Sequence, residues 1–440
     1  MEKEVLITTP YRAKGERYEY WSSNVDRTIY YTYDKNNSNG LRFLKKNIPE
    51  IDILEFPTWE EYEKALNEKD YDIVGFSFFT HEWPATKKMV EEAKKRNIPE
   101  LWAGNYGALT YGIKKHFDHI FIGYSEKEVA EALGKKIDRI KHPMIVDYIG
   151  MSGGIRGFPL GLLFTSRGCS QGCDFCQTPV FCSEQYKLSL PSIEQVIKNY
   201  KKAGIDEILI EDENFGAFKR HTDDVISLLQ KYDMNWYVMT RVDILDTNLD
   251  RWLERGFVGV HLGVESLRQK ALDKIGKKID VHQTMNLLSR LDEKNAFVIG
   301  YYILGFEEDT VISMKKSIKE LNKYSIDLLQ LCVLTPFPRT PLWEDVEEKY
   351  GIIEDDWGKW NTKHLVWDHP NISQIEMEKT LKWGFKKAYS PLKFMRSPTK
   401  YYLRRTRKDG HLKTQTKMLK DFILSNIGVN TELSYGLYDQ

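Results

Sequence analysis

Short apolar runs alternate with amphipathic stretches through the first 150 residues. The apolar runs have the length of buried strands, and we expect strands at Glu4–Thr8, Ile51–Phe56, Asp72–Phe78, Glu100–Ala103 and His119–Ile122. Stretches with helical spacing lie between or after them, at Trp59–Asn67, Pro84–Arg96 and Glu126–Leu133. This alternation predicts an α/β unit built on a doubly wound, Rossmann-like parallel sheet.

The same rhythm repeats six times between about residues 160 and 335. Strands are expected at Leu160–Thr165, Glu207–Glu211, Asn235–Thr240, Phe257–Leu262, Phe297–Ile303 and Leu328–Leu334. Helical patterns such as Ser192–Lys202, Thr222–Lys231 and Thr310–Tyr324 fill the gaps. Six β/α units of this size predict a partial (β/α)6 barrel, with functional residues at the carboxyl ends of its strands.

Two changes in pattern divide the chain. The run Gly150–Pro159 holds four glycines without periodicity, which is typical of a linker or mobile loop. After residue 335 the pattern becomes less regular and rich in Trp and Tyr. We therefore expect an N-terminal doubly wound unit at 1–149, a barrel at 150–335 and a mainly helical, basic region at 336–440.

The overall charge is balanced, since 64 Lys and Arg offset 64 Asp and Glu. This balance argues against a nucleic-acid partner for the whole protein, although a local basic patch is still compatible with it. The longest apolar run, Phe297–Phe306, is far shorter than the ~18 residues that a membrane-spanning helix needs. The N-terminus lacks the layout of a secretory signal, so we expect a cytoplasmic protein.

The strongest chemical signal is a cluster of three cysteines among the five in the chain. Cys169, Cys173 and Cys176 follow a predicted strand with three and two intervening residues, and Gly168 and Gly172 let the backbone turn tightly around them. Three soft thiolates at this spacing indicate zinc or an iron–sulfur cluster. Structural zinc normally takes four ligands, so a zinc site would need a further donor such as Cys182.

This C-x3-C-x2-C loop, with Phe175 before the last cysteine, resembles the signature of the radical S-adenosylmethionine (SAM) superfamily. The resemblance covers the whole predicted barrel. It implies a [4Fe–4S] cluster on the three cysteines, with one iron left open to bind SAM. It also implies one-electron cleavage of SAM to a 5′-deoxyadenosyl radical, which takes hydrogen from an unactivated carbon.

The resemblance also implies a set of SAM contacts at the barrel rim. The stretch containing Asp212 and Glu213 looks like the acidic motif that holds the methionine ammonium group, and either carboxylate fits. Arg241 is a candidate partner for the methionine carboxylate. A rim salt bridge from Arg241 to Glu213 or Glu265 is an equally good interpretation.

The fourth predicted barrel strand is similar to the family's G-x-I-x-G-x-x-E region. It supplies Gly263 for close approach of SAM, and Glu265 and Ser266 for polar contacts. His261 stands where the family usually has an apolar residue. A lone histidine on a strand is more often a core or rim residue than a ligand.

The N-terminal segment resembles the cobalamin-binding domain that precedes the barrel in one subgroup of the family. The matching positions, which imply cobalamin contacts, are Pro10, Ser77, Gly104, Gly123 and Glu126. Ala103 replaces one glycine of the subgroup's pair, and Tyr124 and Ser125 alter its acidic turn. No D-x-H-x-x-G motif is present, so cobalt ligation by a histidine of that motif is not expected. His81 is more simply explained as a surface-loop residue.

The C-terminal segment begins with Leu334–Leu342, similar to the L-T-P-x-P-G-T-P stretch of the same subgroup. Its aromatic residues either wall a substrate pocket or form the core of a small helical domain. From Lys386 to Lys420 there are twelve Lys or Arg and a single acid, Asp409. This basic stretch suits a solvated helical face, with contact to a membrane surface or an anionic substrate as the alternative.

These features together predict a radical SAM enzyme with a single cluster, because residues 1–168 contain no cysteine for a second one. The favoured function is cobalamin-dependent methyl transfer or C–C bond formation on a small molecule or lipid. The electron would come from a donor such as ferredoxin or flavodoxin. A cobalamin-independent cyclase, isomerase or dehydrogenating enzyme with a relic N-terminal domain is the alternative. A zinc- or nucleic-acid-binding protein is a more distant one.

Overall fold

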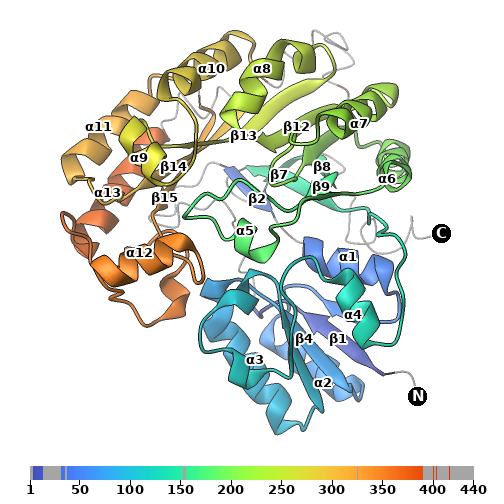
Figure 1. Cartoon of the computed structure of the whole chain (residues 1–440). Coiled ribbons are helices and arrows are strands. Elements are labelled where there is room, and N and C mark those ends of the chain that lie inside the picture. The colour runs from blue at the N-terminus through green and yellow to red at the C-terminus, as the bar shows by residue number, and fades with distance from the viewer. Residues whose placement is uncertain are drawn as a thin grey trace.

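The computed structural model describes residues 3–12, 31–34, 37–151, 155–324 and 326–389, together with residues 400, 403 and 416. Two α/β units lie against one another, with the N-terminal unit below a larger curved sheet and its helices (Figure 1). Helix α5 lies between the two units, and helix α12 borders both of them on one side (Figure 1). The α/β fold class expected from the sequence is confirmed.

The N-terminal unit is built on five parallel strands in the order β3-β1-β4-β5-β6. In chain order these strands are β1 Val5–Thr8, β3 Asp52–Leu54, β4 Ile73–Ser77, β5 Glu100–Gly104 and β6 His119–Ile120. Four of them fall within the runs expected from the sequence, and β5 extends one residue beyond its expected run, to Gly104. Because the chain starts in the middle of the sheet and extends it in both directions, the sheet is doubly wound, and ligands of such sheets bind at the carboxyl ends of the strands.

Helices cover both faces of this sheet, as the alternation of its side chains requires. Ile73 and Trp102 pack on one face, against α1 and α4, whereas Val74 and Phe76 pack on the other, against α2 and α3. The helices span α1 Asn39–Asn47, α2 Trp59–Glu68, α3 Trp83–Lys95 and α4 Glu126–Ala132. Helix α2 begins at a capping box, in which Thr58 and Glu61 each bond the other's backbone N–H.

The larger sheet has eight strands in the order β15-β14-β13-β12-β11-β8-β7-β2. The six strands from β8 to β15 are parallel to their neighbours, and β7 and β2 extend the sheet in antiparallel fashion. The parallel strands span β8 Ile155–Leu163, β11 Glu207–Ile210, β12 Asn235–Thr240, β13 Phe257–Glu265, β14 Phe297–Leu304 and β15 Leu328–Val333. This curled, open sheet is the partial barrel that the six β/α repeats predict.

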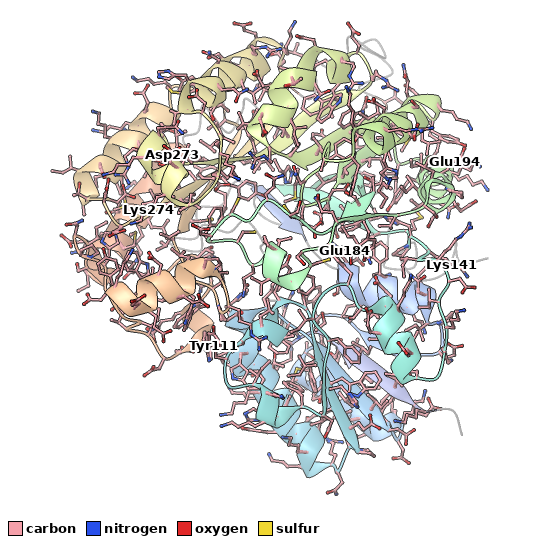
Figure 2. All side chains as sticks on the ribbon, in the orientation of Figure 1. Tyr111, Lys141, Glu184, Glu194, Asp273 and Lys274 are labelled. Carbon is pink, nitrogen blue, oxygen red and sulfur yellow. The ribbon has the colours of Figure 1, made fainter. Side chains whose placement is uncertain are left out.

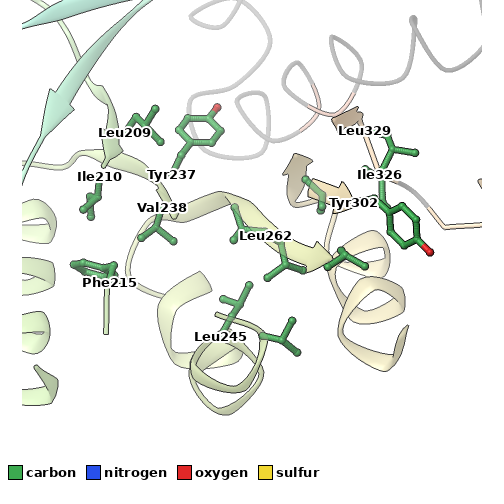
Figure 3. Packing of buried hydrophobic residues seen from close by; sticks show 14 of the residues in the cluster. Leu209, Ile210, Phe215, Tyr237, Val238, Leu245, Leu262, Tyr302, Ile326 and Leu329 are labelled. Atoms are coloured by element: carbon green, nitrogen blue, oxygen red, sulfur yellow. The ribbon is translucent and has the colours of Figure 1, made fainter. Parts of the chain in front are cut away.

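Helices line the outer, convex side of the barrel sheet (Figure 1). Val238 of β12 and Leu262 of β13 point toward Leu245 of α8, while Tyr237 points to the opposite side of the sheet (Figure 3). Burying this layer of side chains supplies the main driving force for closing the helices onto the sheet. The helices span α6 Leu190–Lys202, α7 Lys219–Lys231, α8 Val242–Leu253, α10 Val281–Glu293 and α11 Val311–Leu321.

The described residues of the glycine-rich run expected to be a linker or mobile loop, 150–151 and 155–159, are instead part of the barrel sheet. Strand β7, Val146–Met151, pairs with β8 in antiparallel register, so that Tyr148 lies opposite Pro159. The prediction was wrong because glycine carries no side chain to reveal an alternating pattern. Strand β2, Tyr31–Asp34, belongs to the N-terminal segment yet pairs with β7. The proposed boundaries at 149 and 335 stay a prediction.

The C-terminal region is helical, with α12 at Pro341–Lys349 and α13 at Gln374–Ala388. Its tryptophans Trp343, Trp360 and Trp367 are buried, and Trp360 packs 4.6 Å from Trp357 between ring centres. Core packing therefore accounts for these aromatic residues. Most of the basic stretch 386–420 lies outside the described residues, so its proposed roles stay predictions. Within the part of the chain that is described, no helix has the length and apolarity needed to cross a membrane.

Candidate functional site

A short antiparallel ribbon presents the three cysteines at the carboxyl end of β8. Strand β9, Ser166–Arg167, leads into the cysteine loop, and β10, Tyr186–Lys187, leads out of it. The backbone N–H of Cys169 donates to the carbonyl of Cys182 at 3.2 Å, which closes the base of the loop. Gly168 has φ +82°, and a Cβ there would lie 2.6 Å from the carbonyl oxygen of Glu184. Glycine is therefore required at this position.

The cysteine loop is held by backbone hydrogen bonds to two other segments of the chain. The N–H of Asp174 donates to the carbonyl of Ile275 at 3.2 Å, and its carbonyl accepts from the N–H of Leu342 at 3.0 Å. Within the loop, the N–H of Cys176 donates to the carbonyl of Cys173 at 3.0 Å. Helix α5, Thr178–Phe181, follows directly.

The thiols of the loop have the chemistry of metal ligands that are protonated until a metal binds. Burial is the main influence that raises the pKa of Cys169 and of Cys173. Metal binding would displace these protons, since the thiolate is the ligand. Across the described residues, no three Cys, His, Asp or Glu side chains are gathered around a single-ion site. An iron–sulfur cluster makes a different demand, because its thiolates bind separate irons.

The two candidate carboxylates after β11 face different partners. Asp212 is buried and accepts three hydrogen bonds, from the Thr165 N–H at 2.6 Å, the Thr165 hydroxyl at 2.5 Å and the Ser166 hydroxyl at 2.7 Å. It therefore fixes the strand end from which the cysteine loop begins. Glu213 lies beside the loop itself, where it accepts from the Gly168 N–H at 3.1 Å and from the Tyr124 hydroxyl. Burial raises the pKa of both carboxyl groups.

Arg241 does not form either of the salt bridges considered from the sequence. Its Nε donates to Asp243 at 2.9 Å, and its Nη2 donates to the carbonyl of Lys278 at 3.2 Å. It stands at the start of α8, just after β12. Its guanidinium still contributes to the electrostatic environment of Cys173.

The end of β13 brings a buried ion pair to the same rim. Glu265 accepts from Nζ of Lys277 at 2.6 Å, and their side chains are 8% and 12% exposed. Glu265 has φ +57° at an irregularity of the strand. A Cβ at Gly263 would lie 2.3 Å from Oε1 of Glu265, so the glycine makes room for this pair.

The other barrel residues considered from the sequence are Ser266, Phe175 and His261. Ser266 is buried, and its hydroxyl accepts from the N–H of Arg268 at 3.1 Å. Phe175 is half-buried against the main core. His261 is buried beside Tyr301 on β14, and burial lowers its pKa to about 3, so its ring is neutral.

A crevice opens where the carboxyl ends of the N-terminal sheet face the barrel. It encloses about 1210 Å³ of space, part of which is open to solvent. Its lining includes four of the five positions that the sequence assigned to a cobalamin site: Ser77, Gly104, Gly123 and Glu126. Pro10 is buried but does not line it. Phe164 and Phe181, from the barrel unit, form part of the opposite wall.

Glycines shape the floor of this crevice. A Cβ at Gly104 would meet only the carbonyl oxygen of Phe121, at 4.0 Å, so that position opens freely into the crevice. A Cβ at Gly75, also in the lining, would touch Ile7 at 3.3 Å. Small residues at strand ends allow a large flat ligand to approach the backbone closely. The crevice therefore fits a large ligand held mainly by shape.

A buried cation connects the crevice to the cysteine loop. The guanidinium of Arg167 pairs with Glu126 through two contacts of 2.9 and 2.8 Å. It also lies 4.1 Å from the ring centre of Phe43 and 4.3 Å from that of Tyr124. Because Arg167 immediately precedes Gly168 and Cys169, the N-terminal unit holds the start of the loop directly.

Further contacts join the two units around this cation. The hydroxyls of Tyr106 and Thr178 are 3.1 Å apart, and the Tyr106 ring stacks on Phe181 at 4.2 Å. Tyr111 lies at the border between the N-terminal unit and α12 (Figure 2), where its hydroxyl accepts from the N–H of Arg339 at 3.2 Å. The crevice and the cysteine loop thus share one packed interface.

Comparison with known proteins assigns the family. The radical SAM superfamily matches residues 163–321, which hold the three cysteines and most of the barrel. This segment of the chain is a radical SAM domain. The family uses a [4Fe–4S] cluster and SAM, and the cysteine loop supplies the thiolate donors that such a cluster takes.

Two curated relatives of this radical SAM protein are methyltransferases by name. An uncharacterized methyltransferase of Pyrococcus horikoshii is 27% identical over 236 residues, which cover 52% of this chain and 51% of the relative. The bacteriochlorophyllide d C-8(2)-methyltransferase of Chlorobaculum tepidum is 23% identical over 69% of this chain and 75% of that enzyme. The Pyrococcus match thus spans only about half of its relative.

Solved radical SAM structures share the fold over almost the whole chain. The methyltransferase TsrM from Kitasatospora setae, with cobalamin and a [4Fe–4S] cluster bound, matches with a TM-score of 0.62 at 13% identity. The match covers 96% of this chain and 100% of TsrM. The cobalamin-dependent enzyme OxsB, with aqua-cobalamin and SAM bound, has the same TM-score at 14% identity, over 96% of this chain and 75% of OxsB. The N-terminal unit is therefore part of the shared architecture.

Three residues of this radical SAM site escaped the sequence analysis: Tyr124, Arg167 and Lys277. Tyr124 was noted only as a departure from a motif, and the other two carry no spacing that marks them. Their partners lie at least 12 residues away in the sequence and meet them only in the fold. His81 was also interpreted wrongly, since it is half-buried in a 3₁₀ helix and its pKa falls to about 4 through burial and nearby Lys363.

Proposed function

We propose that the protein is a cobalamin-dependent radical SAM enzyme that transfers a methyl group, or forms a C–C bond, at an unactivated carbon. The observation that carries this proposal is the position of the N-terminal crevice. It faces the barrel across the interface that Arg167 and Glu126 join, next to the cysteine loop. A ligand in the crevice would therefore lie close to chemistry at the barrel mouth.

Cys169, Cys173 and Cys176 would hold the cluster, which when bound would coordinate SAM and supply the electron for its cleavage. The chain's own part is to position and shield this centre. Asp212 anchors the strand end before the loop, and Gly168 permits the turn that follows. Cys182 contributes a carbonyl to the loop base through its backbone.

Glu213 is our candidate for the methionine ammonium group. Asp212 already accepts three hydrogen bonds from the chain and lies buried beneath the rim. Glu213 accepts two, and it reaches the cysteine loop rather than the strand below it. Gly263 and Glu265 lie at the end of β13, and Ser266 follows it directly. Arg241 and Phe175 complete the candidate contacts to SAM.

Cobalamin would occupy the crevice, with Ser77, Gly104, Gly123 and Glu126 in its lining. Gly104 supports this assignment, because a Cβ there would meet only the Phe121 carbonyl oxygen, at 4.0 Å. Glu126 would act through Arg167, with which it is already paired, rather than as a free carboxylate. Pro10 would act only as a buried support.

The relatives support methyl transfer as the reaction, since both curated proteins described above are named methyltransferases. Radical SAM enzymes act on small molecules and require a reductant. For this chain we propose a small-molecule or lipid substrate, ferredoxin or flavodoxin as electron donor, and a cytoplasmic location. Contact of the basic stretch with a membrane surface is also a proposal.

The deciding experiment is an anaerobic assay of the reconstituted protein with SAM and dithionite, run with and without hydroxocobalamin. 5′-Deoxyadenosine and S-adenosylhomocysteine are measured separately. We expect both products when cobalamin is present. 5′-Deoxyadenosine alone under both conditions would support the cobalamin-independent alternative. A colourless, iron-free protein with stoichiometric zinc would overturn the radical SAM assignment of the cysteines.

A further inference from the structure

Lys277 lies next to the cysteine loop, at the rim of the barrel. It follows α9, Gln269–Lys274, in a short loop that packs directly on the cysteines' own backbone. A Cβ at Gly276 would lie 3.5 Å from the carbonyl oxygen of Gly172, and the Asp174 N–H donates to the carbonyl of Ile275. The loop that carries Lys277 is therefore fixed against the loop that carries the thiols.

The ammonium of Lys277 is buried and forms an ion pair. Its carboxylate partner, Glu265, is 2.6 Å away, and the nitrogen lies 6.0 Å from the ring centre of Phe175. Phe175 lies between Cys173 and Cys176 in the chain, so the ammonium is held over the part of the loop that carries two of the three thiols.

Arg241, the other cation of this rim, pairs with Asp243 on its own helix and donates to the carbonyl of Lys278. Lys277 differs from it because the loop that carries Lys277 packs directly on the cysteine loop.

Such a charge has a defined effect on an iron–sulfur cluster. Adding an electron to a cluster held by three thiolates makes the centre more negative. A nearby cation stabilises that reduced form more than the oxidised form, and it does so strongly where water is excluded. The midpoint potential of the cluster therefore rises, and the weak reductants of a cell can load it with an electron more easily.

We propose that Lys277, held in place by Glu265 in the space left by Gly263, is a positioning residue that raises the reduction potential of the cluster. This inference rests on the proposed function, since it needs a cluster on Cys169, Cys173 and Cys176. Glu265 has the opposite electrostatic sign, so it orients Lys277 while moderating its effect.

The test uses the full chain reconstituted with iron and sulfide, titrated with dithionite and mediators in the absence of SAM and followed by electron paramagnetic resonance. Lys277→Met keeps the length of the side chain but removes its charge. At a fixed potential, we expect the ratio of reduced to oxidised cluster to fall at least about tenfold, which is about 59 mV for a one-electron couple. Lys277→Arg should stay near the wild type.

Glu265→Gln provides a test of opposite sign. The amide still accepts a hydrogen bond from Lys277 but no longer offsets its charge, so the reduced fraction should rise. Lys278→Met removes an exposed charge from the same loop, where water screens it, and should leave the potential unchanged.

The outcomes separate the inference from the proposed function. If the wild type takes up no iron and sulfide, the proposed function fails. If the wild type loads normally and Lys277→Met and Glu265→Gln have its potential, or shift it in the same direction, the inference is overturned. If Lys277→Met fails to load a cluster, Glu265→Gln still decides, because its predicted rise in potential has no structural explanation.

Discussion

Glu126 and Arg167 form a two-contact ion pair that joins the N-terminal crevice to the residue before the cysteine loop, with distances of 2.9 and 2.8 Å. Both side chains are almost fully buried, at 5% and 2% exposure. A pair of this kind is costly to break, because the remaining charge cannot reach water. The two units are therefore bound most firmly at the point where their chemistry would meet.

Glu126→Gln should destabilise the metal-free protein by about 3–5 kcal/mol, because it leaves the Arg167 guanidinium buried without a counter-charge. Thermal unfolding monitored by circular dichroism measures this loss. Glu308→Gln, which removes the carboxylate of an exposed pair with Lys270, is the matched control and should not change the melting temperature. Equal melting temperatures for Glu126→Gln and the wild type would show that the buried ion pair does not contribute to the stability of the fold.

Replacing Cys169, Cys173 or Cys176 by Ala should abolish cluster uptake, since each removes one of three ligands. Cys182→Ala should retain iron, because Cys182 serves the loop through its carbonyl and its thiol bonds only the carbonyl of Glu184, at 3.4 Å. Iron and sulfide analysis after anaerobic reconstitution measures both effects. Loss of iron in Cys182→Ala would mean that the ligand set is incomplete.

Asp212→Asn and Glu213→Gln should have different consequences although the residues are adjacent. An amide at 212 offers one acceptor atom where two carboxylate oxygens serve three donors, so cluster uptake should fall. Glu213→Gln should load iron normally but bind SAM at least about tenfold more weakly, which corresponds to about 1.4 kcal/mol. Equilibrium dialysis of SAM against the loaded variants distinguishes these effects. Unchanged SAM affinity in Glu213→Gln would remove it from the site.

Gly104→Leu should block the crevice without disturbing the sheet. A Cβ at this position meets only the Phe121 carbonyl at 4.0 Å, so Gly104→Ala is tolerated and serves as the control. The larger leucine side chain would occupy the space above the strand end. We expect cobalamin bound per protein to fall sharply in Gly104→Leu alone, with iron content unchanged in both variants. Normal cobalamin binding to Gly104→Leu would place the ligand elsewhere.

Stability should fall in mild acid because of His142. Its Nε2 accepts from the Phe164 N–H at 2.8 Å, and burial lowers its pKa to about 3. In the unfolded chain the same ring takes a proton near pH 6.5. Below that pH the unfolded state binds more protons, so the free energy of unfolding decreases by about 1.4 kcal/mol per pH unit as the pH falls.

His142→Gln keeps an acceptor for Phe164 but cannot be protonated. The fall in melting temperature between pH 7 and pH 5 should therefore be smaller in this variant than in the wild type. His119→Gln changes an exposed ring and should leave the wild-type pH dependence intact. An identical acid response in all three proteins would contradict the assignment to His142.

The order of elements could be predicted from the sequence because buried strands appear as apolar runs. Strand β12 begins and ends where it was expected, at Asn235 and Thr240. Strand β7 and the first residues of β8 were missed because glycines interrupt the alternation on which such predictions depend. The cysteine loop could also be predicted from the sequence, because the spacing of its three cysteines is a local pattern that does not depend on the fold.

Contacts between segments that are distant in the sequence could not be predicted. Arg167 meets Glu126 across 41 positions, and Tyr124 meets Glu213 across 89. A single sequence offers no signal for such pairs. The sequence also could not decide whether Asp212 or Glu213 contacts the methionine ammonium group. The two residues are adjacent, and only the fold shows in which direction each side chain points.

Strand β2 has a practical consequence for dissecting this protein. It comes from the N-terminal segment of the chain, yet it is an edge strand of the barrel sheet, where it pairs with β7. A fragment that starts at residue 150 would lack β2 and all but the last two residues of β7, and it would leave most backbone groups of β8 unpaired at the edge of the sheet. An exposed edge strand of this kind can pair with strands of other molecules and cause aggregation. Recombinant versions cut between the two units should therefore precipitate, and the chain is best handled whole.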